Sequence, residues 1–188
     1  MLYTRKGDTG TTELFGSPDR LPKDCPLFEA LGTVDELNSL LGVCFAQAHS
    51  AADTADSSPT TVEYRHLAEL IRNVQQDLFI VQAELAGAPK TLDEAHVLHL
   101  ESCIAEVESY ITNPHSFVIA GGSELSAYFD YARAVSRRAE RHVLAVRGDY
   151  PTSADTQKYL NRLSSFLYAL ARKANKLAES KEAKPTYT

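Results

Sequence analysis

Apolar residues recur at alternating steps of three and four along five long stretches of the chain. Such steps keep side chains on one side of an α-helix, which turns once in about 3.6 residues. The stretches predict five amphipathic helices: residues 27–49, 61–86, 92–111, from the glycine pair 121–122 to near Gly148, and 154–179. Long amphipathic helices with short connections are typical of a bundle. We expect an all-α fold, a five-helix bundle in one domain that spans residues 1–188.

The segments outside these helices are polar and rich in small residues. Residues 1–26 combine glycine, proline, threonine and charge, which predicts a loop with a short extended piece near its start. Residues 50–60 are small and polar, which favours a mobile surface loop over a domain linker. The tail at 180–188 is expected to fray.

The composition is that of an ordinary globular chain of 188 residues with a net charge of -6. That charge argues against nonspecific nucleic-acid binding, so any basic site must be local. No apolar run approaches the roughly 20 residues of a membrane span, and the early charge at Arg5 argues against a signal peptide. Three cysteines without CxxC spacing indicate unpaired thiols in a reducing compartment. We therefore expect a cytoplasmic location, or the mitochondrial matrix in a eukaryotic source.

An arginine stripe marks the fourth predicted helix, where Arg133, Arg137 and Arg141 repeat every four residues beside the apolar side. Like charges at this spacing repel one another and weaken a helix by roughly a few tenths of a kcal/mol each. A bound anion, or a carboxylate from another helix, would remove the repulsion. The alternative is a solvated basic edge on which Glu140 pairs with Arg137.

The first predicted helix has an acid beside its apolar side. Asn38 lies on the apolar side and Asp35 lies at its edge. A buried aspartate almost always needs a partner. We favour a partly buried Asp35 that awaits a cation over an acid that faces solvent.

The N-terminal loop has the composition of an anion-binding turn. Gly7 and Gly10 let backbone N–H groups converge, Arg5 and Lys6 add positive charge, and Thr11 and its neighbour add hydroxyl donors. The loop lacks the Walker A pattern. An ordinary surface turn is the alternative.

The third predicted helix contains possible zinc ligands. His96, His99 and Cys103 have a spacing that could place them on one side of the helix. They flank the apolar side, however, and the sequence suggests no fourth ligand. No HExxH, GxSxG or GxGxxG motif is present. We therefore predict no metal site formed by the protein itself.

Four blocks of the sequence resemble the PduO-type ATP:cob(I)alamin adenosyltransferases, and the resemblance runs from Thr4 to about Ala174. The blocks are YTRKGDTG at 3–10, EALGTVDELN at 29–38, the run from FVIAGG to SRRAER at 117–141, and YLNRLS at 159–164. In this order and spacing they are specific to that family. The family usually has a proline before the paired glycines, where this chain has Ala120.

The resemblance implies a five-helix bundle that forms a homotrimer, with ATP held between neighbouring subunits. It implies that Arg137, Asp35 and Arg133 carry the catalysis, with Asp35 paired to Arg137, across the subunit boundary or within the chain. The ATP-binding residues that it implies come from the N-terminal loop and the last two helices: Thr4, Arg5, Lys6, Gly7, Thr11, Thr12, Lys23, Arg137, Arg138, Glu140, Arg141 and Asn161.

The reaction that the resemblance implies is attack by Co(I) of cobalamin on the ribose 5′ carbon of ATP, giving adenosylcobalamin and triphosphate. Mg²⁺ would share the phosphate charge. Phe117 would hold cobalamin without its lower axial base, which makes Co(II) easier to reduce. A reductase and an adenosylcobalamin-dependent enzyme are the expected partners. Two other functions stay open: an ATP-binding cobalamin carrier or regulator without turnover, and a structural helical oligomer.

Overall fold

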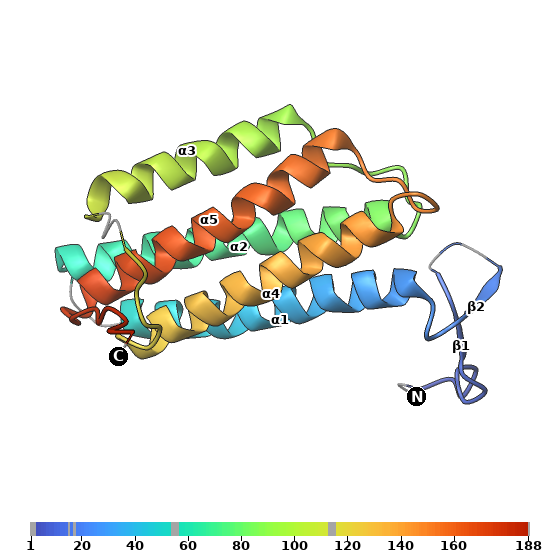
Figure 1. Ribbon diagram of the computed structural model, residues 1–188, viewed down its shortest axis with the longest axis horizontal. Helices are drawn as coiled ribbons and strands as arrows, with labels where there is room; N and C mark the ends of the chain where they lie inside the picture. The colour runs from blue at the N-terminus through green and yellow to red at the C-terminus, as the bar shows by residue number, and fades with distance from the viewer. Residues whose placement is uncertain (1–2, 15, 17, 54–56, 113–115, 188) are drawn as a thin grey trace.

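The computed structural model describes residues 3–14, 16, 18–53, 57–112 and 116–187. In this described part the chain forms five long helices and one pair of short strands (Figure 1). The helices are α1 (Pro26–Ala52), α2 (Pro59–Leu85), α3 (Glu94–Tyr110), α4 (Glu124–Val146) and α5 (Ala154–Leu177). The predicted helical bundle is confirmed, and each helix begins and ends within a few residues of its predicted bounds.

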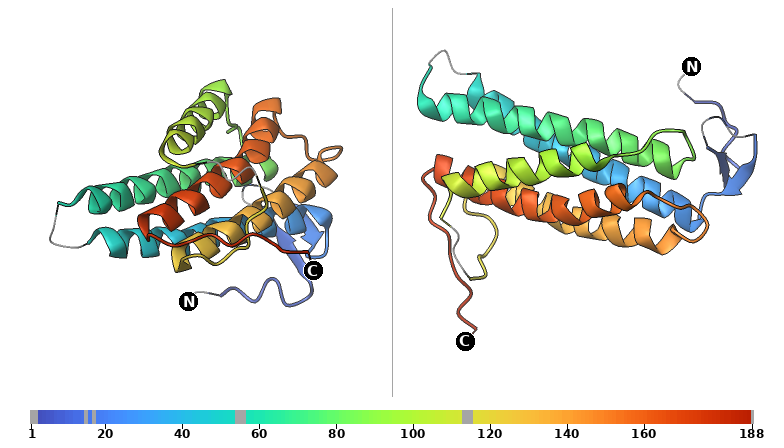
Figure 2. Two further views of the ribbon diagram at one scale, coloured as in Figure 1. Left: turned by 60° about the vertical axis from the view of Figure 1, so that its left-hand side comes forward. Right: turned by 90° about the horizontal axis from the view of Figure 1, so that it is seen from above.

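The helices pack side by side along their lengths (Figures 1 and 2). Helix α1 packs against α2 and α4, α4 packs against α5, and α5 packs against α3. The predicted apolar seams form the core between them. The seam of α2 is buried throughout: Leu67, Leu70, Val74, Leu78, Val81 and Leu85. Among the described helices, none is long and apolar enough to cross a membrane.

Side-chain caps set where four helices begin. Ser58, Asp93, Ser123 and Ser153 each accept a hydrogen bond from the backbone N–H three residues further on. Such caps satisfy one of the N–H groups that a helix start leaves without an intrahelical partner. They explain why α4 begins just after the glycine pair.

The N-terminal segment is more ordered than the loop predicted from its composition. Strand β1 (Thr11–Glu13) pairs antiparallel with β2 (Arg20–Pro22). Arg20 joins the two ends of this segment, because its Nη2 donates to the carbonyl of Lys6 at 2.6 Å and to the carbonyl of Thr11 at 2.9 Å. The hairpin extends beyond the start of α1, away from the bundle (Figure 1).

The tail after α5 is docked rather than frayed, which corrects the prediction. The Ile119 N–H donates to the Ala183 carbonyl at 2.8 Å and forms an isolated antiparallel bridge there. The chain therefore ends beside the segment that leads into α4, at the opposite end of the bundle from the hairpin (Figure 1).

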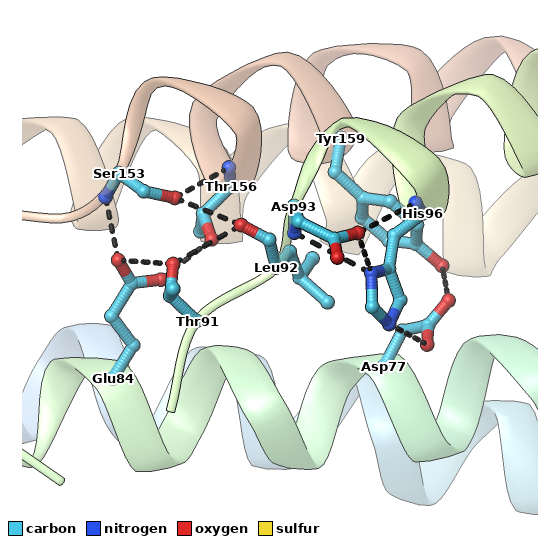
Figure 3. Close-up of polar contacts among 9 residues, drawn as sticks. All are labelled: Asp77, Glu84, Thr91, Leu92, Asp93, His96, Ser153, Thr156 and Tyr159. Carbon is cyan, nitrogen blue, oxygen red and sulfur yellow. Dashed lines mark hydrogen bonds and ion pairs between the residues drawn. The ribbon is translucent and has the colours of Figure 1, made fainter. Parts of the chain in front are cut away.

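A carboxylate of α2 fixes the start of α5 (Figure 3). Glu84 Oε1 accepts hydrogen bonds from the Ser153 N–H at 2.6 Å and from the Thr91 hydroxyl at 3.0 Å. Glu84 Oε2 accepts from the buried Thr156 hydroxyl at 2.5 Å. One carboxylate thus satisfies donors from α5 and from the connection between α2 and α3.

The next turn of α5 is joined to α2 in a similar way (Figure 3). The fully buried Tyr159 hydroxyl donates to Asp77 Oδ2 at 2.8 Å. Burial raises the pKa of Asp77, against the opposing effect of this hydrogen bond, and burial raises the pKa of Tyr159 well above its ordinary value. The contacts of Glu84 with Ser153 and Thr156, and of Asp77 with Tyr159, fix the part of α5 that carries Asn161.

Replacing Glu84 with alanine is expected to lower the free energy of unfolding by about 1–3 kcal/mol, because buried donors lose their acceptor. Chemical denaturation measures this change. Glu69→Ala is the matched control, since Glu69 is an exposed glutamate of the same helix. Equal free energies of unfolding for the two variants would contradict the role given to Glu84.

Candidate functional site

Two arginines of α4 line a hollow between α4, α5 and the end of α3. The hollow has a volume of about 460 Å³, and Arg133 and Arg137 lie on its α4 wall. Among the described residues Arg137 has no ion-pair or hydrogen-bond partner, and its side chain is exposed. Arg133 is half-buried, and its Nε lies 3.8 Å from Asp130 Oδ1 but makes no hydrogen bond. Glu108 is the one acid among the residues that line the hollow, so the two arginines leave positive charge there only partly paired.

Asp130 belongs to a buried ion pair beneath this hollow. Its Oδ2 accepts a hydrogen bond from Arg172 Nη2 at 2.7 Å. Burial raises the pKa of Asp130, while Arg172 and Arg133 oppose that shift. Asp130 shares its charge between Arg172 and Arg133, so the charge of Arg133 is only partly paired.

The opposite wall of the hollow comes from α5. Ser164, Ser165 and Tyr168 line it, and sequence analysis did not single out these residues. The sequence did contain a signal for two of them. Ser165 and Tyr168 lie four and seven residues after Asn161, so helical spacing places them on the same side of α5 as Asn161. Hydroxyl groups here add hydrogen-bond donors to a cationic surface.

Asn161 and Glu140 connect α5 to α4 next to this hollow. Asn161 Nδ2 donates to Glu140 Oε1 at 3.0 Å. Glu140 therefore pairs with Asn161 and not with Arg137, so the structure does not show the Glu140–Arg137 pair of the alternative reading. Arg141 is exposed one turn beyond Arg137. We call the surface formed by Arg133, Arg137, Glu140, Arg141 and Asn161 the α4/α5 face.

Arg138 lies apart from this face. Its guanidinium donates a hydrogen bond to Glu36 of α1, and this bond raises the pKa of Arg138. Successive helical residues differ by about 100° around the axis, so Arg138 turns toward α1 while Arg137 turns toward α5. Within one chain, the side chain of Arg138 therefore lies outside the α4/α5 face to which Arg137 belongs.

Asp35 is exposed, which corrects the expectation of a partly buried acid. Its Oδ1 accepts a weak hydrogen bond from Gln82 of α2 at 3.5 Å. Helix α1 is covered by α2 and α4, and Asp35 lies at the rim of the α2 side. Within the described part of the chain, no ion pair joins Asp35 to Arg137.

The N-terminal segment brings several of its predicted site residues together. The Lys23 ammonium lies against Gly7, where a Cβ would come within 2.9 Å of Nζ. The Lys23 N–H also donates to the Gly10 carbonyl at 2.9 Å. Thr4 Oγ1 accepts from the Lys6 N–H at 3.4 Å.

The backbone of this segment has an unusual conformation at a predicted site residue. Arg5 has a φ of 60°, which a residue other than glycine seldom adopts. Thr11 and Thr12 are half-buried in β1. The hydrogen-bond donors of this segment lie together at one end of the molecule.

The N-terminal segment and the α4/α5 face remain separate in one chain. Within the described part, residues 3–13 make no hydrogen bond or ion pair to α4 or α5. Each surface has cations and hydroxyl groups. The two candidate surfaces are therefore separate within one chain.

Phe117 lies at the surface, 79% exposed. It precedes Gly121, whose φ of 104° is a conformation that favours glycine. The ring of Phe117 is therefore not part of the core.

The histidines considered as zinc ligands have structural contacts. His96 Nδ1 lies 2.6 Å from Asp93 Oδ1 in the capping box of α3, and His99 Nε2 lies 3.8 Å from Cys103 Sγ. Among the described residues, no group of three histidine, cysteine or acidic side chains converges as metal ligands do.

Comparison with known proteins gives consistent matches. Residues 2–174 match the family model described as cobalamin adenosyltransferase. The corrinoid adenosyltransferase PduO of Salmonella typhimurium is 36% identical over 91% of this chain, but the chain covers 48% of that relative, about half its length. A corrinoid adenosyltransferase of Citrobacter freundii is also 36% identical, over 91% of this chain and 93% of its own length.

Solved structures agree with these matches. A phenylalanine-to-histidine variant of a PduO-type ATP:corrinoid adenosyltransferase from Lactobacillus reuteri, complexed with cobalamin and ATP, has a TM-score of 0.84 at 27% identity. The comparison covers 99% of this chain and 97% of the other. An arginine-to-lysine variant from the same organism, complexed with ATP, has a TM-score of 0.82 at 28% identity and covers 98% of this chain and 99% of its own.

Proposed function

The chain belongs to the cobalamin adenosyltransferase family, and on that basis we propose that it transfers the 5′-deoxyadenosyl group of ATP to the cobalt of reduced cobalamin. The products are adenosylcobalamin and triphosphate. The observation that carries the proposal is the incompletely paired charge of Arg133 and Arg137 in the hollow of the α4/α5 face. Such charge suits a polyanionic substrate.

A spacing supports the assignment of two residues. The two Lactobacillus reuteri variants change a phenylalanine and an arginine that lie 20 positions apart in that protein. Phe117 and Arg137 are also 20 positions apart. We propose that Phe117 contacts cobalamin and that Arg137 contacts ATP.

The proposed reaction is a displacement at carbon. Co(I) supplies the electron pair that forms the cobalt–carbon bond, the bond from the 5′ carbon to oxygen breaks, and its electron pair leaves with triphosphate. No proton is removed, so the reaction needs no general base. It needs an in-line approach and cations for the charge that develops on the departing oxygens.

The residues of the α4/α5 face suit these tasks. Arg137 and Arg141 would grip phosphate oxygens, because a guanidinium stays charged and donates in a fork. Arg133 would add charge from inside the hollow. The Glu140–Asn161 pair would orient the nucleotide. We propose that Mg²⁺ enters with ATP and shares the phosphate charge.

We propose that a homotrimer completes the site. The N-terminal segment of one subunit, with Lys23 beside Gly7, would cover ATP on the α4/α5 face of its neighbour. The separation of these surfaces in one chain supports this arrangement. The exposed Asp35 would then meet an arginine of the stripe across the boundary, and Arg138 would help to orient that boundary through Glu36.

Further proposals follow from the chemistry. Cob(II)alamin must gain one electron before it can react, so a reductase is the expected partner upstream, and an adenosylcobalamin-dependent enzyme is the expected recipient. The three free cysteines support a reducing compartment. We propose the cytoplasm, or the mitochondrial matrix in a eukaryotic source.

One spectroscopic assay tests the activity. The protein is mixed with ATP, Mg²⁺ and chemically reduced cobalamin, and the light-sensitive spectrum of adenosylcobalamin is expected. ATP binding without this product would indicate a carrier or regulator. Absence of ATP binding would indicate a structural oligomer.

MgATP is expected to increase the hydrogen-exchange protection of residues 3–12. The hairpin and the contacts of Arg20 hold one end of this stretch, but the stretch buries little apolar surface, so ligand contacts are expected to add to its order. Exchange is measured with and without MgATP, and residues 94–103 of α3 serve as the internal control, since only the far end of α3 reaches the hollow. Unchanged protection in residues 3–12 would rule out ordering on binding.

A further inference from the structure

The C-terminal tail crosses the segment that carries Phe117. The Ile119 N–H donates to the Ala183 carbonyl at 2.8 Å, and the Ser180 hydroxyl donates to the Gly122 carbonyl. In the described part of the chain, the bond to Ala183 is the only backbone–backbone hydrogen bond that residues 117–122 make. The tail is thus the main backbone restraint on this segment.

A buried asparagine of α5 joins the tail to the start of α4. Asn175 is 2% exposed. Its Nδ2 donates to Glu182 Oε1 at 2.9 Å, and its Oδ1 accepts from the Ser123 hydroxyl at 3.1 Å. A Cβ on Gly122 would lie 2.6 Å from Asn175 Oδ1, so the backbone of the segment passes directly over this amide.

Glu182 of the tail also meets a buried cation. Arg172 is 4% exposed, and its Nε lies 3.1 Å from Glu182 Oε1 in an ion pair without hydrogen-bond geometry. The other side of the guanidinium donates to Asp130. A buried charge is costly unless it is paired, so Glu182 has an electrostatic reason to remain docked.

We propose that the tail at 180–183, held by Glu182, is a positioning element that directs Phe117 toward cobalamin. The ring of Phe117 is 79% exposed, so packing of the ring cannot fix its own direction. The backbone must do so, and its restraint at Ile119 comes from the tail. Glu182 and Asn175 are then positioning residues, because they act through the segment. This inference rests on the proposed adenosyltransfer.

The variant Glu182→Ala tests the inference, with Lys181→Ala as the matched control at an exposed neighbouring position of the tail. Hydrogen exchange at the Ile119 amide is expected to be about tenfold faster in Glu182→Ala, the factor that a loss of ~1.4 kcal/mol gives. Turnover from cob(II)alamin with a reductant is expected to fall about tenfold, with ATP affinity unchanged. Lys181→Ala is expected to match the wild type in all three measurements.

Two further measurements separate positioning from general instability. Glu182→Gln keeps an acceptor for Asn175 but loses the charge beside Arg172, so its Ile119 exchange and turnover are expected to lie between those of the wild type and Glu182→Ala. If Glu182→Ala does not fold, Glu182→Gln decides the comparison with Lys181→Ala. A parallel fall in ATP affinity would overturn the proposal, because it would indicate general loosening.

The outcomes also separate this inference from the proposed function. Wild-type protein that makes no adenosylcobalamin would refute the activity and, with it, the role of the tail toward cobalamin. If the wild type is active and Glu182→Ala behaves like Lys181→Ala, only the proposed role of the tail is refuted. Faster exchange at Ile119 without any loss of turnover would likewise refute positioning.

Discussion

Replacing Arg137 with alanine is expected to lower turnover on the order of a hundredfold or more, the effect of removing one preorganised donor to developing negative charge. The melting temperature is expected to stay the same. Arg137 is exposed and lacks a partner among the described residues, so the folded chain does not depend on it. Its guanidinium lines the hollow where we propose that triphosphate departs.

Two variants make this result specific. Arg147→Ala is the matched control, because Arg147 is an exposed arginine at the end of the same helix, outside the α4/α5 face. Arg137→Lys keeps the charge but loses the forked donors, so its turnover is expected to lie between the other two. Steady-state assays with pre-reduced cob(I)alamin measure all three. Turnover of Arg137→Ala within twofold of the wild type would remove Arg137 from the site.

Periodicity predicted the bundle because the core of this fold is built from local repeats. Each helix buries a seam that its own sequence displays, as the seam of α2 from Leu67 to Leu85 does. The short strands gave no comparable signal. Each has three residues, and the contacts of Arg20 with the Lys6 and Thr11 carbonyls depend on how the segment folds back on itself.

Burial of charged residues could not be read from helical spacing alone. Asp35 lies beside a buried seam, yet it is exposed because α2 and α4 leave that edge of α1 uncovered. The reverse holds for Arg172 and Lys173, which are 4% and 2% exposed. Their partners Asp130 and Glu63 are distant in sequence, so each pair requires knowledge of which helices meet.

The same distinction between local patterns and contacts between distant elements applies to the candidate site. The arginine stripe was predicted because its repulsion is a property of one helix. The contact between Glu140 and Asn161 joins two helices and needed the structure. The docked tail was missed because its restraint is polar and long-range: Glu182 meets Arg172 and Asn175, while the tail itself has little apolar content.

Replacing Phe117 with alanine is expected to lower turnover from cob(II)alamin with a reductant by about a hundredfold, which corresponds to ~2.7 kcal/mol in the barrier. We propose that the ring occupies the side of cobalamin from which the lower axial base departs. Without the ring, the base stays bound and Co(II) becomes harder to reduce. Turnover with pre-reduced cob(I)alamin is expected to fall much less, because Co(I) does not retain the lower ligand.

Stability and ATP binding are the internal checks on this variant. A core phenylalanine would cost about 3–5 kcal/mol on truncation to alanine, but Phe117 is 79% exposed, so its melting temperature is expected to match that of the wild type. ATP affinity is expected to persist, since the proposed nucleotide contacts come from the α4/α5 face and the N-terminal segment. Phe79→Ala is the matched control, because Phe79 is 60% exposed on α2, outside both surfaces.

The ratio of the two turnover rates decides the role of Phe117. A loss confined to cob(II)alamin assigns Phe117 to the step that removes the lower ligand, because only that corrinoid state has the ligand to lose. Equal losses with both states would mean that the ring serves binding or orientation of cobalamin in general. A fall in melting temperature that Phe79→Ala does not share would mean that Phe117 supports the fold, and the cobalamin contact would have to be sought elsewhere on the surface.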